Sequence, residues 1–429
     1  LRAMALRHKL NRLRYKAPQE SFWQDLLGLY QKARSRNLAT LGIRPYNEDG
    51  ANTSIQSELL RVLLFEAAPL ENLSSEQIEC LDRFLCGFLD KAVLRDAPNA
   101  QTMFCFEPGK GRGPGRFDPD RPPAGGLFFG PWGAYLEATQ ALAALDKGQE
   151  VAWLQGAPGE GASQLALLRA LNFAWSANPP KRIFPREEAA GTMLVVHDFV
   201  QVRRMVAASA FARSGRQIEF SASYEFRARI QDEYFGSVDQ PNSPPPEVSP
   251  DEEQEILTPS EILERLELAG DREQMEIWTA IDRSAEGIGC IVPHQKKWLR
   301  VSTVIGYRLP GEIDWQIAVL RRLGRTAEGR RLAGLQLLRG IPAAVYVKAV
   351  EGAAHPGQPV AAHALTDFSD GILISAESET LLLDTAEINL DDCLLMVGAG
   401  QQQTVVVSEI LDQLPGLTVL RYSPASPAA

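Results

Sequence analysis

Apolar residues recur at helical spacing through the first part of the chain. Between residues 21 and 91 they fall three or four positions apart, in runs that begin at Phe22 and at Leu59. Further helices are expected at 134–144 and 163–175. The pattern therefore predicts a mainly helical domain over residues 1–175, whose plainest role is packing or contact with a protein partner.

Two segments rich in proline or glycine interrupt the pattern. Residues 108–126 contain both so densely that neither a helix nor a strand is expected, and we predict a mobile loop. Residues 240–255 combine prolines with a run of acidic side chains, which is typical of a linker or a disordered insertion.

Beyond this linker the pattern changes to short apolar runs with β-like spacing, separated by glycine. Strands at such spacing, without a long helix among them, are typical of small antiparallel barrels or sandwiches. The chain is therefore expected to be an α+β protein, with an antiparallel β-barrel at 273–340 and a further small β module at 341–429. The expected strands are 276–280, 289–293, 298–305, 314–320, 333–338, 344–350, 371–375, 380–383, 393–397, 404–408 and 417–422.

Composition and charge narrow the classes of function. The 429 residues carry a formal net charge of −10, which argues against attraction to bulk nucleic acid. The five cysteines and five histidines form no metal-ligand cluster, so no metal is expected, and reduced thiols indicate the cytoplasm. No stretch approaches the ~18 apolar residues of a membrane span, and no signal peptide is recognised.

A glycine-rich series at residues 156–163 follows an apolar run and opens a helix, as a phosphate-binding P-loop does. Ala162 stands where the P-loop lysine should be, and the acidic Glu160 would face the phosphates. A turn that caps the next helix is the simpler interpretation. Because the sequence also lacks a nucleophile motif, no catalytic residue is assigned and an enzyme is not expected.

The segment from Asp282 to Gly287 has the pattern Asp-x-Ser-x-x-Gly between two β-like runs. Asp282 and Ser284 would lie on one face of a strand, where they could donate and accept hydrogen bonds. Gly287 would let the backbone turn or approach a ligand closely. A β-turn that starts at an aspartate would give the same pattern, so both interpretations stay open.

Together with the apolar runs at 298–308, 315–322 and 332–338, this motif resembles the PilZ domain, a bacterial receptor module for cyclic di-GMP. The resemblance covers residues 276–339, and the wider arrangement resembles larger, uncharacterised PilZ-containing proteins of proteobacteria. That family pairs the motif with an upstream Arg-x-x-x-Arg on a flexible arm, which Arg182 and Arg186 match here.

The resemblance implies a role for each residue of the two motifs. Arg182 and Arg186 would bind phosphate and guanine, because guanidinium groups make paired hydrogen bonds to both. Asp282 and Ser284 would bond a base or a ribose, and Gly287 would admit the ligand. The arm is a few tens of residues from the motif in a standard member, whereas 96 positions separate Arg186 from Asp282 here.

That separation requires residues 181–202 to supply the arm and the first barrel strand, followed by an insertion over 203–272. Otherwise the arginines belong to a basic surface turn. Two functions follow. One is a cytoplasmic cyclic di-GMP receptor without a cofactor, which passes ligand binding to a protein partner through the helical domain. The alternative is a degenerate PilZ scaffold for protein–protein contacts that binds no nucleotide.

Overall fold

The computed structural model divides the chain into two compact units, which are described separately. The N-terminal unit comprises Leu1–Ile183 and Arg322–Leu332, and the barrel unit comprises Phe184–Arg321 and Ala333–Ala429. No helix in the described ranges is both long and apolar enough to cross a membrane. The structure describes residues 1–44, 52–107, 110–159, 161–179, 184–214, 258, 260–261, 263, 275–293, 296–326, 328–350, 368–375, 379–385, 388–398, 401–414 and 416–424.

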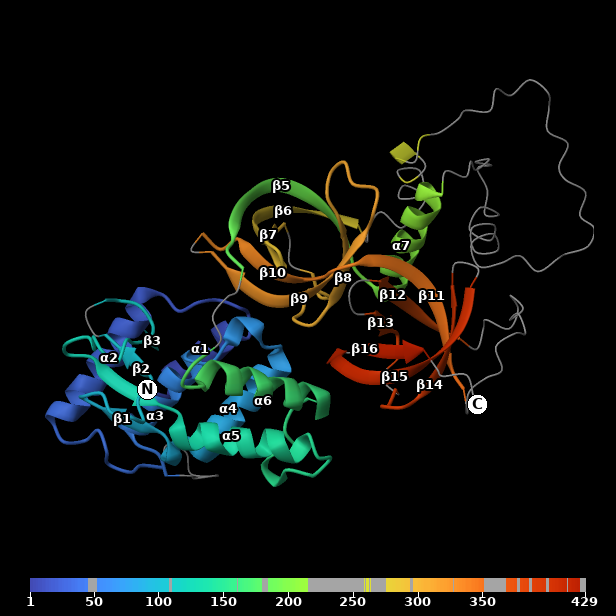
Figure 1. Ribbon diagram of the computed structural model, residues 1–429. Helices are drawn as coiled ribbons and strands as arrows, with labels where there is room; N and C mark the ends of the chain where they lie inside the picture. The colour runs from blue at the N-terminus through green and yellow to red at the C-terminus, as the bar shows by residue number, and fades with distance from the viewer. Residues whose placement is uncertain are drawn as a thin grey trace, which may run out of the picture. The chain divides into compact units, whose positions relative to one another are not determined.

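Helices dominate the N-terminal unit, as the apolar spacing predicts (Figure 1). The side chain of Ser54 caps one helix, and Ser74 with Gln77 forms a capping box at the start of another. Their buried faces meet around Leu26, Leu63 and Phe84 in one core. The helices are α1 (Arg2–Arg12), α2 (Glu20–Ser35), α3 (Ile55–Glu66), η1 (Leu70–Asn72), α4 (Ser75–Phe88), η2 (Leu89–Lys91), α5 (Trp132–Leu145), η3 (Ala152–Leu154) and α6 (Gly161–Trp175).

A small antiparallel sheet, which the sequence pattern did not predict, completes this unit. Its strand order is β1-β4-β2-β3. The strands are β1 (Val93–Arg95), β2 (Phe104–Phe106), β3 (Gly115–Arg116) and β4 (Leu127–Gly130). The prediction that 108–126 contains no strand is therefore wrong at β3, because Gly115 and Arg116 pair with Cys105 and Phe104 of β2. Pairing partners that are distant in sequence outweigh the local turn tendency.

Buried ion pairs attach α1 to α3 and α4. Arg61 donates through Nε to Asp82 Oδ1 at 3.0 Å, and the Asp82 carboxylate also accepts from Lys9 of α1 at 2.9 Å. The side chains of Arg61 and Asp82 are only 6% and 12% exposed. In the same last turn of α1, Arg12 pairs with Glu66. Because Ala5 and His8 are the buried residues of α1, these charges are central to its attachment.

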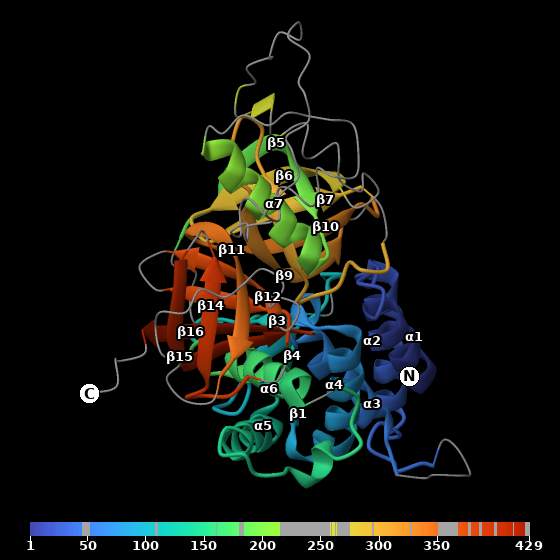
Figure 2. The same cartoon turned by 90° about the vertical axis from the view of Figure 1, so that its right-hand side faces the viewer.

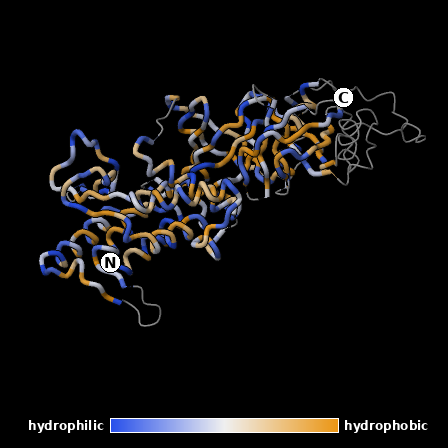
Figure 3. The backbone as a smooth tube through the Cα atoms, turned by 60° about the horizontal axis from the view of Figure 1, so that its bottom comes forward, coloured by the Kyte–Doolittle hydropathy of each residue, from blue (hydrophilic) through white to orange (hydrophobic). Residues whose placement is uncertain are grey.

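The barrel unit contains two closed antiparallel barrels, with orders β10-β7-β6-β5-β8-β9 and β11-β12-β13-β16-β15-β14. This confirms the predicted α+β class, with helices first and β modules after them. Hydrophobic stretches run along both barrels (Figure 3). The strands are β5 (Glu187–Val196), β6 (Met275–Ser284), β7 (Gly287–Val292), β8 (Val304–Arg308), β9 (Gln316–Arg325), β10 (Arg331–Leu338), β11 (Ile341–Ala349), β12 (Ser369–Ser375), β13 (Thr380–Leu383), β14 (Cys393–Gly398), β15 (Gln401–Leu414) and β16 (Leu417–Pro424).

A helix, α7 (Phe199–Arg213), joins the cores of the two barrels (Figures 1 and 2). It packs against β8 of the first barrel and against β11 and β12 of the second. Its Arg203 guanidinium lies over the Tyr346 ring at 4.0 Å and donates to the Val345 carbonyl at 3.1 Å. The expected insertion at 203–272 therefore begins inside this helix. Most of that interval, including the 240–255 linker, lies outside the described residues.

One expected strand of the first barrel is displaced. The prediction of a strand at 298–305 is wrong over its first six positions, because β8 begins only at Val304. Ser302 has a φ of 73°, a left-handed conformation that a strand does not accept. Trp298 instead stacks on His197 with ring centroids 4.1 Å apart. Trp298 also stacks on Trp278 of β6, with ring centroids 6.1 Å apart, so it packs on the first barrel without belonging to a strand.

Candidate functional site

The two sequence motifs meet at one end of the first barrel. Arg186 Nη1 donates to Asp282 Oδ1 at 2.6 Å and to Oδ2 at 2.7 Å, across 96 positions of sequence. Because β5 pairs antiparallel with β6, Glu188 lies opposite Asp282, and the residues just before β5 reach the end of β6. Both side chains are about a quarter exposed. The arm is therefore docked on the Asp-x-Ser motif in this structure.

The motif forms the tight turn between β6 and β7. Ser284 pairs with Gly287 across a two-residue connection, and we call residues 282–287 the site hairpin. Asp282 Oδ1 also accepts the Gly289 N–H at 3.1 Å. Ser284 Oγ lies 3.5 Å from the Gly287 carbonyl, at the limit of a hydrogen bond. Ser284 thus has hydrogen-bonding capacity to spare, whereas Asp282 is well supplied with donors.

Packing explains why the hairpin needs glycine at two positions. A Cβ on Gly287 would lie 2.6 Å from the carbonyl oxygen of Leu335 in β10, and a Cβ on Gly289 would lie 2.5 Å from Asp282 Oδ1. β10 is held close by a hydrogen bond of 3.0 Å from the Leu337 N–H to the Glu286 carbonyl. Gly287 therefore brings the hairpin against β10, independently of any ligand.

We expect Gly287→Ala to lower the free energy of unfolding by about 1–3 kcal/mol, because the clash is with backbone. The midpoint of thermal unfolding of the full chain measures this change. Gly191→Ala is the matched control, since no atom lies within 4 Å of the added Cβ in β5. Equal midpoints for the two variants would contradict the tight fit of Gly287 on β10.

A second arginine, which belongs to neither sequence motif, reaches the same hairpin. Arg339 Nε donates to the Ala285 carbonyl at 2.9 Å, and its guanidinium lies over the Phe184 ring, 5.5 Å from the centroid. Arg339 and Gly340 form the connection between β10 and β11, which we call the inter-barrel linker. No sequence signal marks Arg339, because its place depends on how β10 pairs with β7.

The interior beside the site is apolar. Cys290 on β7 is buried, and burial, followed by the charge of Asp282, raises the pKa of its thiol to about 12. The thiol is therefore neutral and unreactive near neutral pH. Within the described part of the chain, no cluster of histidine, cysteine and carboxylate side chains has the arrangement of a metal site.

The other candidate residues add no described contact to the site. Arg182 lies outside the described residues. Another Arg-x-x-x-Arg pair, Arg321 and Arg325, lies within β9, where Arg321 donates to Asp412 at 2.6 Å. In the glycine-rich series, Gln164 Nε2 donates to the Gly159 carbonyl at 3.1 Å, and Arg83 donates to the Gly156 carbonyl at 2.5 Å. These bonds attach carbonyls of the series to α6 and to α4.

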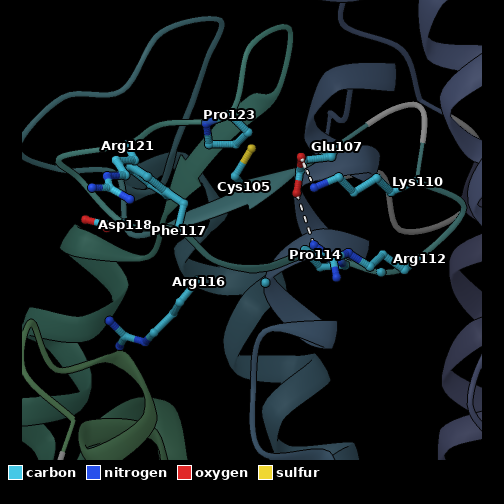
Figure 4. A pocket seen from close by; sticks show the side chains of 12 residues that line it. Cys105, Glu107, Lys110, Arg112, Pro114, Arg116, Phe117, Asp118, Arg121 and Pro123 are labelled. Carbon is cyan, nitrogen blue, oxygen red and sulfur yellow. Dashed lines mark hydrogen bonds and ion pairs between the residues drawn. The ribbon is translucent and has the colours of Figure 1, made fainter.

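A pocket of about 500 Å³ lies in the N-terminal unit (Figure 4). Lys110 and Arg112 converge on Glu107 from one side, at 2.7 Å and 3.2 Å. Arg116 extends away from them and donates to the Ala174 carbonyl at the end of α6, at 2.7 Å. Lys110, Arg112 and Arg116 of this pocket thus have acceptors of their own.

The N-terminal unit has a known relative. Residues 1–99 match a family model described as "Cyclic-di-GMP receptor FimW, N-terminal domain". No curated protein and no solved structure matches the chain. The matched segment contains α1 to α4, with the buried ion pairs of Asp82 and Glu66, and ends before β2. The chain is therefore similar, over its first quarter, to a domain of a cyclic di-GMP receptor.

Proposed function

We propose that this protein is a receptor for cyclic di-GMP and that the ligand binds at the end of the first barrel, which we assign to the PilZ family. The ligand-binding residues in this proposal are Arg182, Arg186, Asp282, Ser284 and Gly287. The contact of Arg186 with Asp282 carries the proposal, because it joins the two halves of the motif despite 96 intervening positions. The similarity of residues 1–99 to a receptor domain supports it independently.

The proposed chemistry follows from the groups at the site. Cyclic di-GMP presents phosphodiester oxygens and the O6 and N7 acceptors of guanine, all of which a guanidinium binds through paired N–H donors. The Asp282 carboxylate accepts from the N–H groups of a base, and the Ser284 hydroxyl bonds a base or ribose. Ligand binding therefore draws Arg186 away from Asp282 or shares it between the two, and the arm moves with it.

We further propose that a protein partner reads this movement. The arm leads into β5 and then into α7, whose Arg203 contacts Tyr346 and pairs with Asp370 in the second barrel at 3.2 Å. Transmission requires that the ligand bind two arrangements of these elements with different affinity. The helical domain is the proposed partner surface. The five cysteines are free, which supports a reducing compartment such as the cytoplasm.

The same ion pair also supports the second candidate function. Asp282 accepts from Arg186 and from the Gly289 N–H, so its carboxylate is satisfied without a ligand. A degenerate PilZ scaffold would keep this pair as a latch between arm and hairpin and would use its surfaces for protein contacts. The two candidate functions differ in whether a nucleotide separates Arg186 from Asp282.

Calorimetric titration of the full chain with cyclic di-GMP tests the proposal. We expect a dissociation constant of about 1 μM or tighter, because a site with several charge-assisted hydrogen bonds supplies about −8 kcal/mol or more. GTP tests whether a guanine nucleotide is sufficient for binding, and cyclic di-AMP tests whether a cyclic dinucleotide backbone is sufficient. Both should bind much more weakly than cyclic di-GMP. A folded sample that does not bind cyclic di-GMP would reject the receptor and leave the scaffold.

A further inference from the structure

Arg339 lies where a ligand between the arm and the hairpin would meet it. The arm has two described contacts, Arg186 with Asp282 and Phe184 with Arg339. The hairpin likewise meets Arg339, through the Ala285 carbonyl. One guanidinium thus touches both segments that form the proposed site. Arg339 is exposed, so a molecule from solvent has access to it.

Most of the hydrogen-bond donors of Arg339 have no acceptor among the described residues. Nε donates to Ala285, whereas the two Nη atoms have no hydrogen-bond partner or counter-ion among the described residues. The hydrogen bond through Nε fixes the position of the planar group, which lowers the entropy cost of a further contact. A guanidinium held in this way can grip a phosphate with its Nη atoms and stack a purine on its face.

Phe184 occupies one face of that guanidinium. A cation beside an aromatic ring at an exposed site is stabilised by about 0.5–1 kcal/mol, which is weak enough for a ligand to displace. A guanine base offers a larger flat ring than phenylalanine and brings phosphates with it. The base and the Phe184 ring therefore compete for the same surface.

We propose that Arg339 is a third ligand-binding arginine of the site, which stacks a guanine base or grips a phosphate of cyclic di-GMP, and that Phe184 competes with the ligand for it. This inference rests on the proposed function and adds a contact from outside both motifs. Because Arg339 belongs to the inter-barrel linker, the ligand would also touch the chain directly before β11. Gly340, its neighbour, has a φ of 135° and packs against the Ser375 carbonyl of β12, so the linker is tightly seated.

Two substitutions with opposite expected effects test the proposal. Arg339→Ala should weaken the binding of cyclic di-GMP about 10-fold or more, since a hydrogen bond to a charged group is lost. Phe184→Ala should strengthen binding about 2- to 5-fold, since the competing ring is removed. Calorimetric titration of the full chain measures both. Arg339→Lys should bind more tightly than Arg339→Ala but more weakly than the wild type, because an ammonium group neither stacks on a base nor makes paired hydrogen bonds.

Arg300→Ala is the matched control. Arg300 also is exposed and donates its Nε to a backbone carbonyl, that of Lys297, at 3.3 Å, but it lies in the connection after β7, away from the hairpin. Its loss should leave the affinity unchanged. Wild-type affinity in Arg339→Ala, with binding lost in Arg186→Ala, would overturn this inference and keep the receptor. Weaker binding in Phe184→Ala would show that the ring supports the ligand and would overturn the competition.

Discussion

Replacing Arg186 by alanine is expected to reduce the affinity for cyclic di-GMP by about 100-fold, the largest effect of any single substitution at the site. The substitution removes a charged donor for phosphate or guanine. It also leaves Asp282 without its cation, although the Gly289 N–H still donates to that carboxylate. Both effects weaken the site, because an uncompensated carboxylate repels the phosphates of the ligand.

Three further variants separate these effects. Asp282→Asn keeps an acceptor for Gly289 and removes the repulsion, so the double variant Arg186→Ala with Asp282→Asn should bind more tightly than Arg186→Ala alone. Arg186→Lys keeps the charge but not the paired donors. Its affinity for cyclic di-GMP should therefore lie between those of the wild type and Arg186→Ala. Arg112→Ala, in the other unit, should bind like the wild type. Equal affinities of Arg186→Ala and wild type would refute the assigned site, even if cyclic di-GMP binds elsewhere.

The regular elements of this fold are predictable where their signal is local. The strand expected at 380–383 is β13 to the residue, and the helix expected at 163–175 is α6 with two more residues. These segments have a clear period and clear boundaries. The strands β1 to β4 lack such a signal because they span only two to four residues and depend on partners elsewhere in the chain.

The helix α7 could not be predicted from the sequence for a different reason. It is buried on several sides, with Val202, Met205 and Phe211 in the core shared by the two barrels. A helix packed all round has no single apolar face, so its sequence does not show the amphipathic pattern of a surface helix. For that reason the expected insertion begins at residue 203, in the middle of a helix that packs against both barrels.

The candidate site was predictable in part. The motif residues Arg186, Asp282, Ser284 and Gly287 could be named from their spacing, but not the contact between Arg186 and Asp282, which depends on the pairing of β5 with β6. Arg339 carries no motif at all. Its position follows from the hydrogen bond between Leu337 and Glu286, which seats the end of β10 on the hairpin. The binding roles and the PilZ resemblance remain predictions.

The second large effect concerns stability. Asp82→Ala should lower the free energy of unfolding of the N-terminal unit by about 3–5 kcal/mol, because the buried Arg61 guanidinium loses its hydrogen-bonded carboxylate and keeps the more distant Glu58, at 3.9 Å. It also removes an acceptor of Lys9, which keeps Glu79 as its other partner. Asp96→Ala is the matched control in the same unit. Asp96 forms an Arg–Asp pair with Arg34, but both side chains are more than half exposed, so its loss should cost about 0.2–1 kcal/mol.

Hydrogen exchange of the amides in α3 and α4, measured in the full chain, separates the two cases. These amides should exchange at least about 100-fold faster in Asp82→Ala than in the wild type. The loss of stability lowers the free energy that local opening of the helices costs. Asp96→Ala should change it less than about 5-fold. Comparable protection in both variants would mean that the Arg61–Asp82 pair does not stabilise these helices.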